Sequence, residues 1–233
     1  MDWTRRSLEK EWMETERVEA GDYARCLADL AVVNTVTLAR RPTLAFMRRV
    51  TRGLPPGSRV SVLDAGFGEG DMLRRIARWG KRRGLALELE GVDLDPVSAQ
   101  AAAALTPPEL GIRYRTGDVF DERPRGVDVV ISSLFTHHLT DAQVVAFLRW
   151  MERTARLGWF VNDLHRHALA YHGFALLSRA AGWHRFVQHD GRLSVARSFR
   201  RADWARLLAA AGLERVAEVR WHVPFRLCVS RVR

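Results

Sequence analysis

Hydrophobic and polar residues follow two different periods along this chain, one typical of strands and one typical of helices. From residue 59 onward, short runs rich in valine, isoleucine and leucine are followed by longer stretches with apolar residues at helical spacing. The runs predict strands at 59–64, 87–93, 112–116, 127–132, 157–162, 214–222 and 226–232. The longer stretches predict helices at 71–83, 96–104, 141–156, 165–179 and 201–212. This alternation predicts a mostly parallel α/β sheet with helices on both faces.

The end of the chain predicts an antiparallel strand. Only residues 223–225 separate the last two predicted strands. A crossover between parallel strands needs about a dozen residues or more, so these two strands must pair antiparallel. We therefore predict seven strands, of which the last runs against the others.

Helices are also predicted before the first strand. They are expected at residues 2–17, at 22–40 and from Pro42 to about Gly53, ahead of a turn at 54–58. We expect residues 1–57 to form a helical cap over the active site, and residues 58–233 to form the core. The long connection at about 180–200 is expected to be a lid-like insertion.

The stretch SVLDAGFGEGDML, residues 61–73, is expected to bind a ligand. It reads as a strand, a turn with Gly66, Gly68 and Gly70, and the start of a helix. Alternating glycines allow the backbone to approach a ligand closely. A dinucleotide-binding turn would have its third glycine at position 71, which is Asp71.

Acidic residues around this turn favour a cationic ligand over a diphosphate. Asp64, Glu69 and Asp71 crowd the turn, and no basic residue lies between Arg59 and Arg74. The acids would alternatively cap the next helix, which accounts for Asp71 but not for Asp64 at the strand end. Further acids follow the next two strands: Asp93 is suited to ribose hydroxyls, and Asp118 to an adenine amine.

Four motifs in this order resemble the class I S-adenosylmethionine-dependent methyltransferases, in their branch that acts on small molecules. They are VLDAGFGEG, GVDLDP, TGDVFD and VDVVISSLFTHHL, and the resemblance extends over residues 58–233. It implies a Rossmann-like fold, S-adenosylmethionine as cofactor and S-adenosylhomocysteine as product. It also implies that Asp64 and the glycine turn hold the methionine end, Asp93 the ribose and Asp118 the adenine. Neighbouring positions expected to contribute to this site are Ala65, Leu94, Val119 and Ser132.

Asn34 has two interpretations. It lies on the apolar face of the helix predicted at 22–40. A buried amide must find several hydrogen-bond partners, which are either backbone groups of the core or the cofactor or substrate.

Candidate catalytic residues follow the fourth and fifth strands, because ligands of open α/β sheets lie beyond the carboxyl ends of the strands. They are His137, His138, Asp163 and His165. Histidine is suited to act as a base near neutral pH. His138 precedes a leucine in an H-H-L motif similar to that of quinone-type methylases, where this histidine lies near the acceptor. Alternatively, one of the two histidines caps the helix that begins near Thr140.

Several observations make nucleic acid an unlikely partner. Residues 132–135 do not match the (D/N)-P-P-(Y/F) signature of methylases that act on base amines, and no cysteine nucleophile lies nearby. The formal net charge is +10, but it comes almost entirely from arginines spread through the chain. This distribution favours a solvated surface over a nucleic-acid footprint.

Composition bears on the number of domains, on disulfides and metals, and on the location of the protein. The 233 residues suffice for one α/β domain, and two distant cysteines, Cys26 and Cys228, indicate neither a disulfide framework nor a metal site. The charged start is not a signal peptide, and no apolar run is long enough to span a membrane. We expect a cytoplasmic monomer or homodimer without a metal.

The predicted reaction is methylation of a hydrophobic small molecule. The helix sequence HALAYHGFALL, residues 167–177, is apolar nearly all round, which fits either ordinary burial or a wall for a bulky acceptor. O-methylation of a phenolic or polyketide-like hydroxyl by a histidine base is the first hypothesis, and C-methylation of a quinol-type ring is the second. A non-catalytic cofactor-binding protein and an RNA methyltransferase are alternatives of other classes, since fold does not fix substrate.

Overall fold

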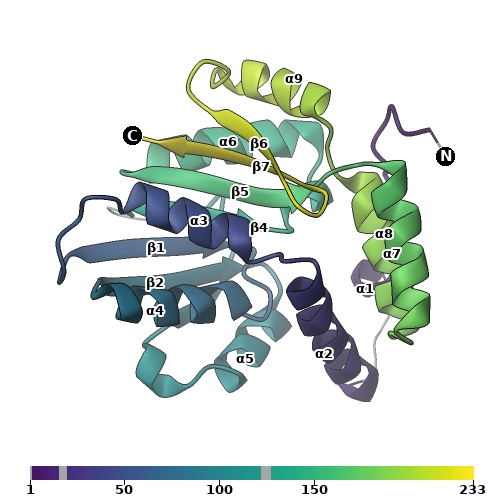
Figure 1. Cartoon of the computed structure of the whole chain (residues 1–233), viewed down its shortest axis with the longest axis horizontal. Helices are drawn as coiled ribbons and strands as arrows, with labels where there is room; N and C mark the ends of the chain where they lie inside the picture. The colour runs from purple at the N-terminus through teal and green to yellow at the C-terminus, as the bar shows by residue number, and fades with distance from the viewer. Residues whose placement is uncertain (1, 16–19, 122–126) are drawn as a thin grey trace.

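Seven strands form one sheet in the computed structural model, which describes residues 2–15, 20–121 and 127–233. The sheet order is β3-β2-β1-β4-β5-β7-β6, and it confirms the predicted Rossmann-like fold (Figure 1). The strands are β1 (Arg59–Ala65), β2 (Ala86–Asp93), β3 (Arg113–Thr116), β4 (Val129–Ser133), β5 (Gly158–Leu164), β6 (Glu218–His222) and β7 (Arg226–Val232). The first five run parallel, whereas β7 pairs antiparallel with both β5 and β6.

Each face of the sheet has its own hydrophobic core. On one face, α3 (Arg41–Val50) and α4 (Asp71–Arg83) bury Phe46, Met47 and Ile76 against β1 and β4. On the other face, α6 (Asp141–Thr154) and α9 (Arg201–Ala211) bury Phe147 and Trp204. The helix α5 (Pro96–Ala104) packs beside β3. Two short 3-10 helices complete the core, η1 (Pro108–Leu110) and η2 (Thr136–His138).

Four helices form a separate group beside the sheet, which we call the helical module (Figure 1). They are α1 (Trp12–Thr15), α2 (Ala20–Val36), α7 (Ala168–Ala180) and α8 (Arg185–Arg197). Their shared core contains Cys26 from α2 together with Trp183, Phe186 and Val187. Because α8 contacts η2, which follows β4, the module lies at the carboxyl ends of the parallel strands.

Three sequence predictions about secondary structure were wrong. The helix expected at 2–17 is limited to α1 among the residues described there, because the backbone of residues 2–11 bonds to side chains and to other elements: the Ser7 amide, for example, donates to the Ala196 carbonyl. Residues 16 and 17 lie outside the described part of the chain. The connection expected at 180–200 contains the helix α8, which packs against α7. Strand β6 begins at Glu218 instead of 214, because a turn follows α9.

No helix in the described ranges combines the length and the apolar character that a membrane span requires.

Two glycines should respond in opposite directions to replacement by alanine. At Gly158, the first residue of β5, a Cβ would collide with the backbone carbonyl of Arg231 in β7. Gly158→Ala should therefore lower the free energy of unfolding by at least about 2 kcal/mol. At Gly173 in α7, nothing lies within 4 Å of an added Cβ, so Gly173→Ala should raise it by about 0.5–1 kcal/mol. Urea unfolding of both variants measures the difference, and equal effects would contradict the proposed backbone collision.

Candidate active site

The glycine turn between β1 and α4 has one open position. Gly66, Gly68 and Gly70 all have positive φ angles, of 73°, 54° and 72°. A Cβ at Gly66 would collide with the Phe135 ring, and one at Gly70 would collide with Tyr114. At Gly68 nothing described lies within 4 Å of an added Cβ. Gly66 and Gly70 are thus required by packing, whereas Gly68 leaves room for a ligand to approach the backbone.

Asp93, at the end of β2, is bonded to the glycine turn. Its Oδ2 accepts the Gly68 amide at 2.9 Å, and its Oδ1 accepts the Asp95 amide at 3.0 Å. Leu94 beside it is exposed. Asp118, which follows β3, is also exposed and accepts the Phe120 amide at 2.9 Å, next to the buried Val119. The predicted ribose and adenine acids therefore lie at one edge of the sheet with the glycine turn.

Asp64 is a buried acid with an unsatisfied oxygen. Its side chain is 1% exposed, and its Oδ1 has no hydrogen-bond partner in the described structure. Burial raises the pKa of Asp64 well above its ordinary value, and the neighbouring Asp93 and Asp71 raise it further. Asp71 itself is paired with Arg40 at 2.6 Å. A cationic ligand beside Asp64 would supply both the missing partner and the missing counter-charge.

The end of β4 and the end of α2 contribute further groups. The Ser132 hydroxyl is buried and donates to the Ala65 carbonyl at 2.8 Å, which ties β4 to β1. The next hydroxyl, of Ser133, is buried without a partner. Leu134 has a φ of 56°, which is uncommon outside glycine and is typical of functional sites. Asn34 is half-buried in α2, and its backbone carbonyl accepts the Ala39 amide.

Of the seven buried side-chain atoms that lack a hydrogen-bond partner in the described structure, three lie at the carboxyl ends of neighbouring strands. Asp64 Oδ1, Ser133 Oγ and His165 Nδ1 belong to the ends of β1, β4 and β5, and these three strands are adjacent in the sheet. A buried polar atom without a partner costs about 1–3 kcal/mol. Such atoms are rare in folded proteins, so three of them at one edge indicate a binding site.

Asp163, in β5, holds η2 in place. The carboxylate accepts the Thr136 hydroxyl and the His137 amide through Oδ2. Its Oδ1 lies 2.8 Å from His137 Nδ1 and accepts the Leu164 amide. Burial alone would raise its pKa, but His137 and these hydrogen bonds lower the pKa of Asp163 to about 2. An ionised carboxylate only accepts hydrogen bonds, so His137 Nδ1 must be the donor.

His137 and His138 lie side by side, with ring centroids 4.2 Å apart. His137 is buried, and its Nε2 lies 3.7 Å from an oxygen of Glu11 in the N-terminal segment. Sequence reasoning missed Glu11, since only the fold brings it beside a histidine 126 positions further along. Neither histidine caps α6, because Thr140 forms that cap.

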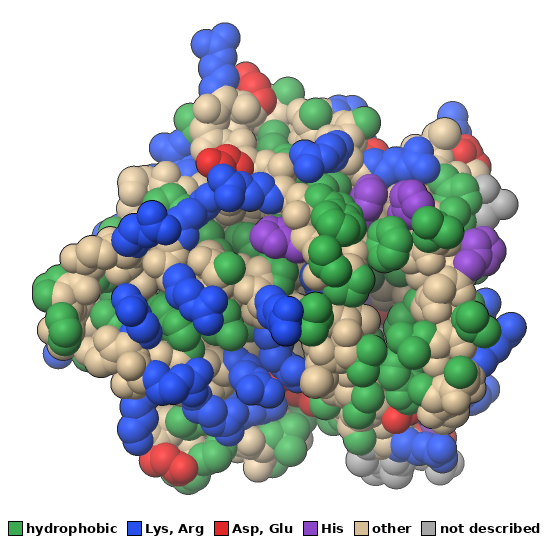
Figure 2. Space-filling view, in the orientation of Figure 1, with side chains coloured by type: hydrophobic (Ala, Val, Ile, Leu, Met, Phe, Trp, Pro, Cys, Tyr) green, Lys and Arg blue, Asp and Glu red, His purple; other side chains and the backbone are tan. Residues whose placement is uncertain are grey.

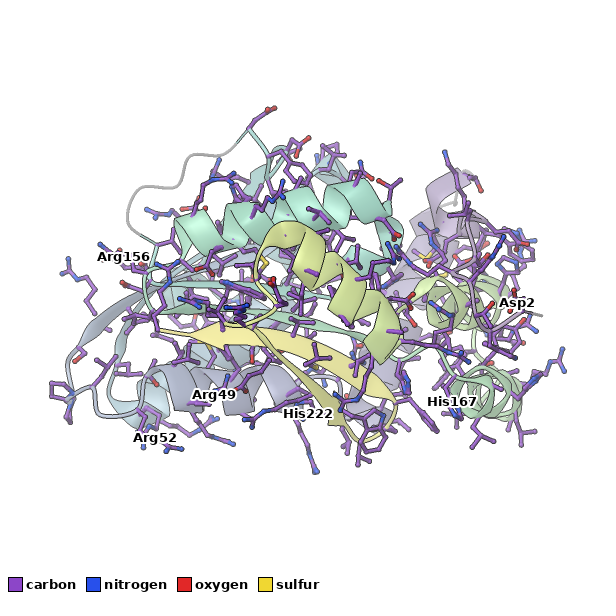
Figure 3. All side chains as sticks on the ribbon, turned by 90° about the horizontal axis from the view of Figure 1, so that it is seen from above. Asp2, Arg49, Arg52, Arg156, His167 and His222 are labelled. Carbon is purple, nitrogen blue, oxygen red and sulfur yellow. The ribbon has the colours of Figure 1, made fainter. Side chains whose placement is uncertain are left out.

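His165, directly after β5, is bonded to the hairpin between β6 and β7. Its amide donates to the Phe225 carbonyl at 2.8 Å, and its ring lies 5.6 Å from that of His167. Burial lowers the pKa of His165, and the positive charge of His167 and of nearby arginines lowers it further. Its imidazole is therefore neutral at neutral pH. Figure 3 shows His167 at the start of α7 and His222 on the hairpin.

A hollow of the surface lies at the amino ends of the parallel strands, opposite the glycine turn. Its lining includes Arg59, Glu88, Arg113 and Arg156. Figure 3 shows Arg156 at the far end of the molecule from His167. Because the glycine turn and the unsatisfied atoms lie at the carboxyl ends of the strands, we place the active site there.

Comparisons with known proteins identify the class of the domain and of the fold. Residues 62–158 match the family model described as a methyltransferase domain. No curated protein matches the chain. The solved structure of the plantazolicin methyltransferase BpumL, in complex with a pentazolic desmethylPZN analog and S-adenosylhomocysteine, is similar in fold. Its TM-score is 0.67 at 12% identity, over 95% of this chain and 93% of that one.

Two further structures share the fold at lower similarity. Magnesium protoporphyrin IX methyltransferase from Synechocystis PCC 6803, with bound S-adenosylhomocysteine, has a TM-score of 0.52 at 16% identity, over 93% of this chain and 88% of that one. LepI in complex with S-adenosylmethionine has a TM-score of 0.55 at 18% identity, over 80% of this chain and 46% of that one. The chain thus contains a methyltransferase domain. The fold of the chain is that of the class I methyltransferases, as its four motifs predicted.

Replacing Asp64 with asparagine should stabilise the ligand-free protein. A folded-state pKa above the unfolded one means that stability is greatest below the unfolded pKa, about 3.9 for Asp, and is lost as pH rises. Asp64→Asn should remove this loss, so its melting temperature at pH 8 should exceed the wild-type value by roughly a few degrees. The difference should shrink toward pH 5.

Asp93→Asn is the matched control for this measurement, because the Asp93 carboxylate accepts two amides. It should lower the melting temperature. If Asp64→Asn is less stable than wild type at pH 8, the Asp64 carboxylate has a counter-charge that this structure does not contain.

Proposed function

We propose that this methyltransferase transfers a methyl group from S-adenosylmethionine to a hydroxyl of a hydrophobic small molecule, such as a phenol or a polyketide. The observation that carries the proposal is the unsatisfied Asp64 carboxylate beside the open glycine turn at Gly68. A ligand without a cationic group beside Asp64 would leave that carboxyl group without a counter-charge. S-adenosylmethionine carries an ammonium in its methionine part and a sulfonium, and S-adenosylhomocysteine keeps the ammonium.

The residues at the carboxyl edge of the sheet fit the parts of this cofactor. Asp64 would hold the ammonium of the methionine end, with the glycine turn against its backbone. Asp93 would accept the ribose hydroxyls, and Asp118 the adenine amine. When bound, the cofactor supplies an electrophilic methyl group and leaves as S-adenosylhomocysteine. The similar structures were solved with S-adenosylhomocysteine or S-adenosylmethionine, which supports the same choice here.

Exposed apolar side chains support a hydrophobic acceptor. Val36 in α2 is 52% exposed, Leu176 in α7 is 73% exposed and Val223 at the hairpin tip is 62% exposed. Figure 2 shows hydrophobic side chains gathered on the side of the molecule where the hairpin and the helical module face each other. The helical module would then cap the acceptor, in the role expected for residues 1–57 and for the lid. Two of the similar structures are methyltransferases for plantazolicin and for magnesium protoporphyrin IX.

His165 is the best placed of the four candidate catalytic residues to act as the base. It is neutral at neutral pH, and its Nδ1 has no partner in the described structure. The proton of the acceptor hydroxyl would pass to this imidazole while the oxygen forms its bond to the methyl carbon. Asp163 and His137 already bind each other, so they position η2 instead. His138 remains a second candidate base.

C-methylation of a quinol-type ring would use the same base and the same apolar surface. Mass spectrometry of the product, with fragmentation to find the methylated atom, separates the two reactions.

Gly68→Ala tests the cofactor site. The added Cβ should occupy the space of the ligand, so calorimetric titration with S-adenosylhomocysteine should show at least about tenfold weaker binding than the one-to-one binding expected of wild type. Gly111→Ala is the control, because Gly111 has a similar φ of 60°, has nothing within 4 Å and lies after η1. Absence of binding to the wild-type protein at millimolar ligand would refute the proposed cofactor.

His165→Gln tests the base. Turnover of a confirmed acceptor should fall by about 10²–10⁴-fold, whereas the dissociation constant for S-adenosylhomocysteine should stay within about twofold. Because the pKa of His165 is lowered, the wild-type rate should be constant above neutral pH and fall only at a pH below the ordinary histidine pKa of about 6.5. His172→Gln, which changes an exposed histidine of α7, is the control. Unchanged turnover in His165→Gln would assign the base to another residue.

A further inference from the structure

Three metal-ligating side chains converge beside the proposed acceptor site. They are Glu11 of the N-terminal segment and the adjacent His137 and His138 of η2. One potential ligand atom of each lies within 4.8 Å of those of the other two. His137 Nε2 lies 3.7 Å from Glu11 Oε1. Atoms at such separations can surround one ion at bond lengths of about 2.0–2.2 Å after small side-chain movements.

The orientation of His137 is already fixed for this purpose. Its Nδ1 donates to the Asp163 carboxylate at 2.8 Å, which leaves Nε2, on the side of Glu11, as the nitrogen that the neutral imidazole would offer to a metal. Histidines that bind metals almost always donate their other ring nitrogen to a carboxylate or carbonyl in this way. Asp163 is completely buried and receives three more hydrogen bonds, which makes the support rigid.

Glu11 is held in position by the helical module. It is buried, and its Oε1 accepts the Ser194 hydroxyl of α8 at 2.7 Å. The amides of the next two residues, Trp12 and Met13, both donate to Asp190 of the same helix, at 2.9 and 3.0 Å. The Glu11 carboxylate is thus delivered to η2 by a fixed backbone and not by a free chain end.

Two arginines lie close to the cluster, and both bind backbone carbonyls there. Arg197 donates to the carbonyls of His137 and His138, at 3.3 and 3.4 Å. Arg6 donates to the His137 carbonyl at 3.1 Å and pairs with Asp141 at 2.8 Å. Their positive charge would repel a cation. The negative charge of the Glu11, Asp163 and Asp190 carboxylates compensates for that of the arginines.

We propose that Glu11, His137 and His138 bind a divalent transition-metal ion of the Zn²⁺ type, which joins the N-terminal segment to the carboxyl end of β4. Two imidazoles and one carboxylate suit Zn²⁺ and similar ions, whereas Mg²⁺ and Ca²⁺ prefer an all-oxygen set. Three protein ligands leave a fourth position open for water or for an acceptor oxygen. This site is separate from the glycine turn, so it does not depend on the proposed cofactor.

Metal binding to the purified full chain tests the proposal. After removal of metal with a chelator, Zn²⁺ should bind one-to-one in calorimetry, and Co²⁺ should give the visible absorption bands of a low-coordinate site. Glu11→Gln and His138→Ala should each weaken Zn²⁺ binding by about 100-fold. Asp163→Asn should weaken it by about 10–100-fold through His137. His172→Ala removes an exposed histidine outside the cluster and should leave the affinity unchanged.

The outcomes separate this proposal from the proposed function. S-adenosylhomocysteine affinity should be kept in Glu11→Gln and His138→Ala, because neither residue belongs to the glycine turn. Zn²⁺ binding that is equal in wild type, Glu11→Gln and His138→Ala would overturn the site and assign the ion to surface histidines. Absence of stoichiometric binding and of a Co²⁺ spectrum in wild type would overturn it too. Glu11 and His138 would then interact through a hydrogen bond instead of a metal ion. The wild-type Co²⁺ spectrum decides the question even if a variant fails to fold.

Discussion

The buried carboxylate of Asp163 fixes the end of the sheet where the chemistry takes place. It lies in β5, yet it binds the side chain of Thr136 and both the backbone and the ring of His137 beyond β4. Because its pKa is about 2, the charge is present throughout the physiological range and needs all of these donors. The ends of β4 and β5 are therefore fixed relative to each other, and so are His137, His138 and His165. The neighbouring Asn162 extends this network, since its amide binds the Ala39 carbonyl and the Thr43 hydroxyl of the N-terminal region.

Asp64, beside the glycine turn, and Asp163 show two opposite uses of a buried acid. Asp163 is fully satisfied, so it stabilises local structure and orients a histidine. Asp64 is equally buried but lacks a partner on one oxygen, so it is suited to bind a ligand. The two residues have the same side chain, and each is the second-last residue of its strand, β1 or β5. Their different hydrogen-bond partners alone separate a positioning group from a binding group.

Much of the fold and of the cofactor edge could be predicted from the sequence, because both depend on local patterns. The helices at 71–83 and 96–104 were predicted with the bounds that the structure shows, and the final hairpin followed from the short connection at 223–225. The acids Asp64, Asp93 and Asp118 could be placed together because the carboxyl ends of parallel strands share an edge.

The parts that could not be predicted depend on contacts between distant segments. Residues 2–11 are not helical in the structure, because the backbone of the N-terminal segment binds α8. No local signal in the sequence indicates this contact. The helix α8 was missed because Gly191 and polar residues interrupt its apolar face, yet Gly191 packs against the Phe174 ring of α7. Glu11 could not be assigned, since its position beside His137 appears only in the folded chain.

The helical module is assembled from two pieces of chain that lie far apart in the sequence. Its core joins Cys26 of α2 and Trp12 of α1 to Phe186 of α8 and Phe174 of α7. A chimera that exchanges only the region of α7 and α8 with another enzyme would confront the old N-terminal helices with a foreign surface. Recombination must therefore exchange both gene segments together to keep the core of the module intact.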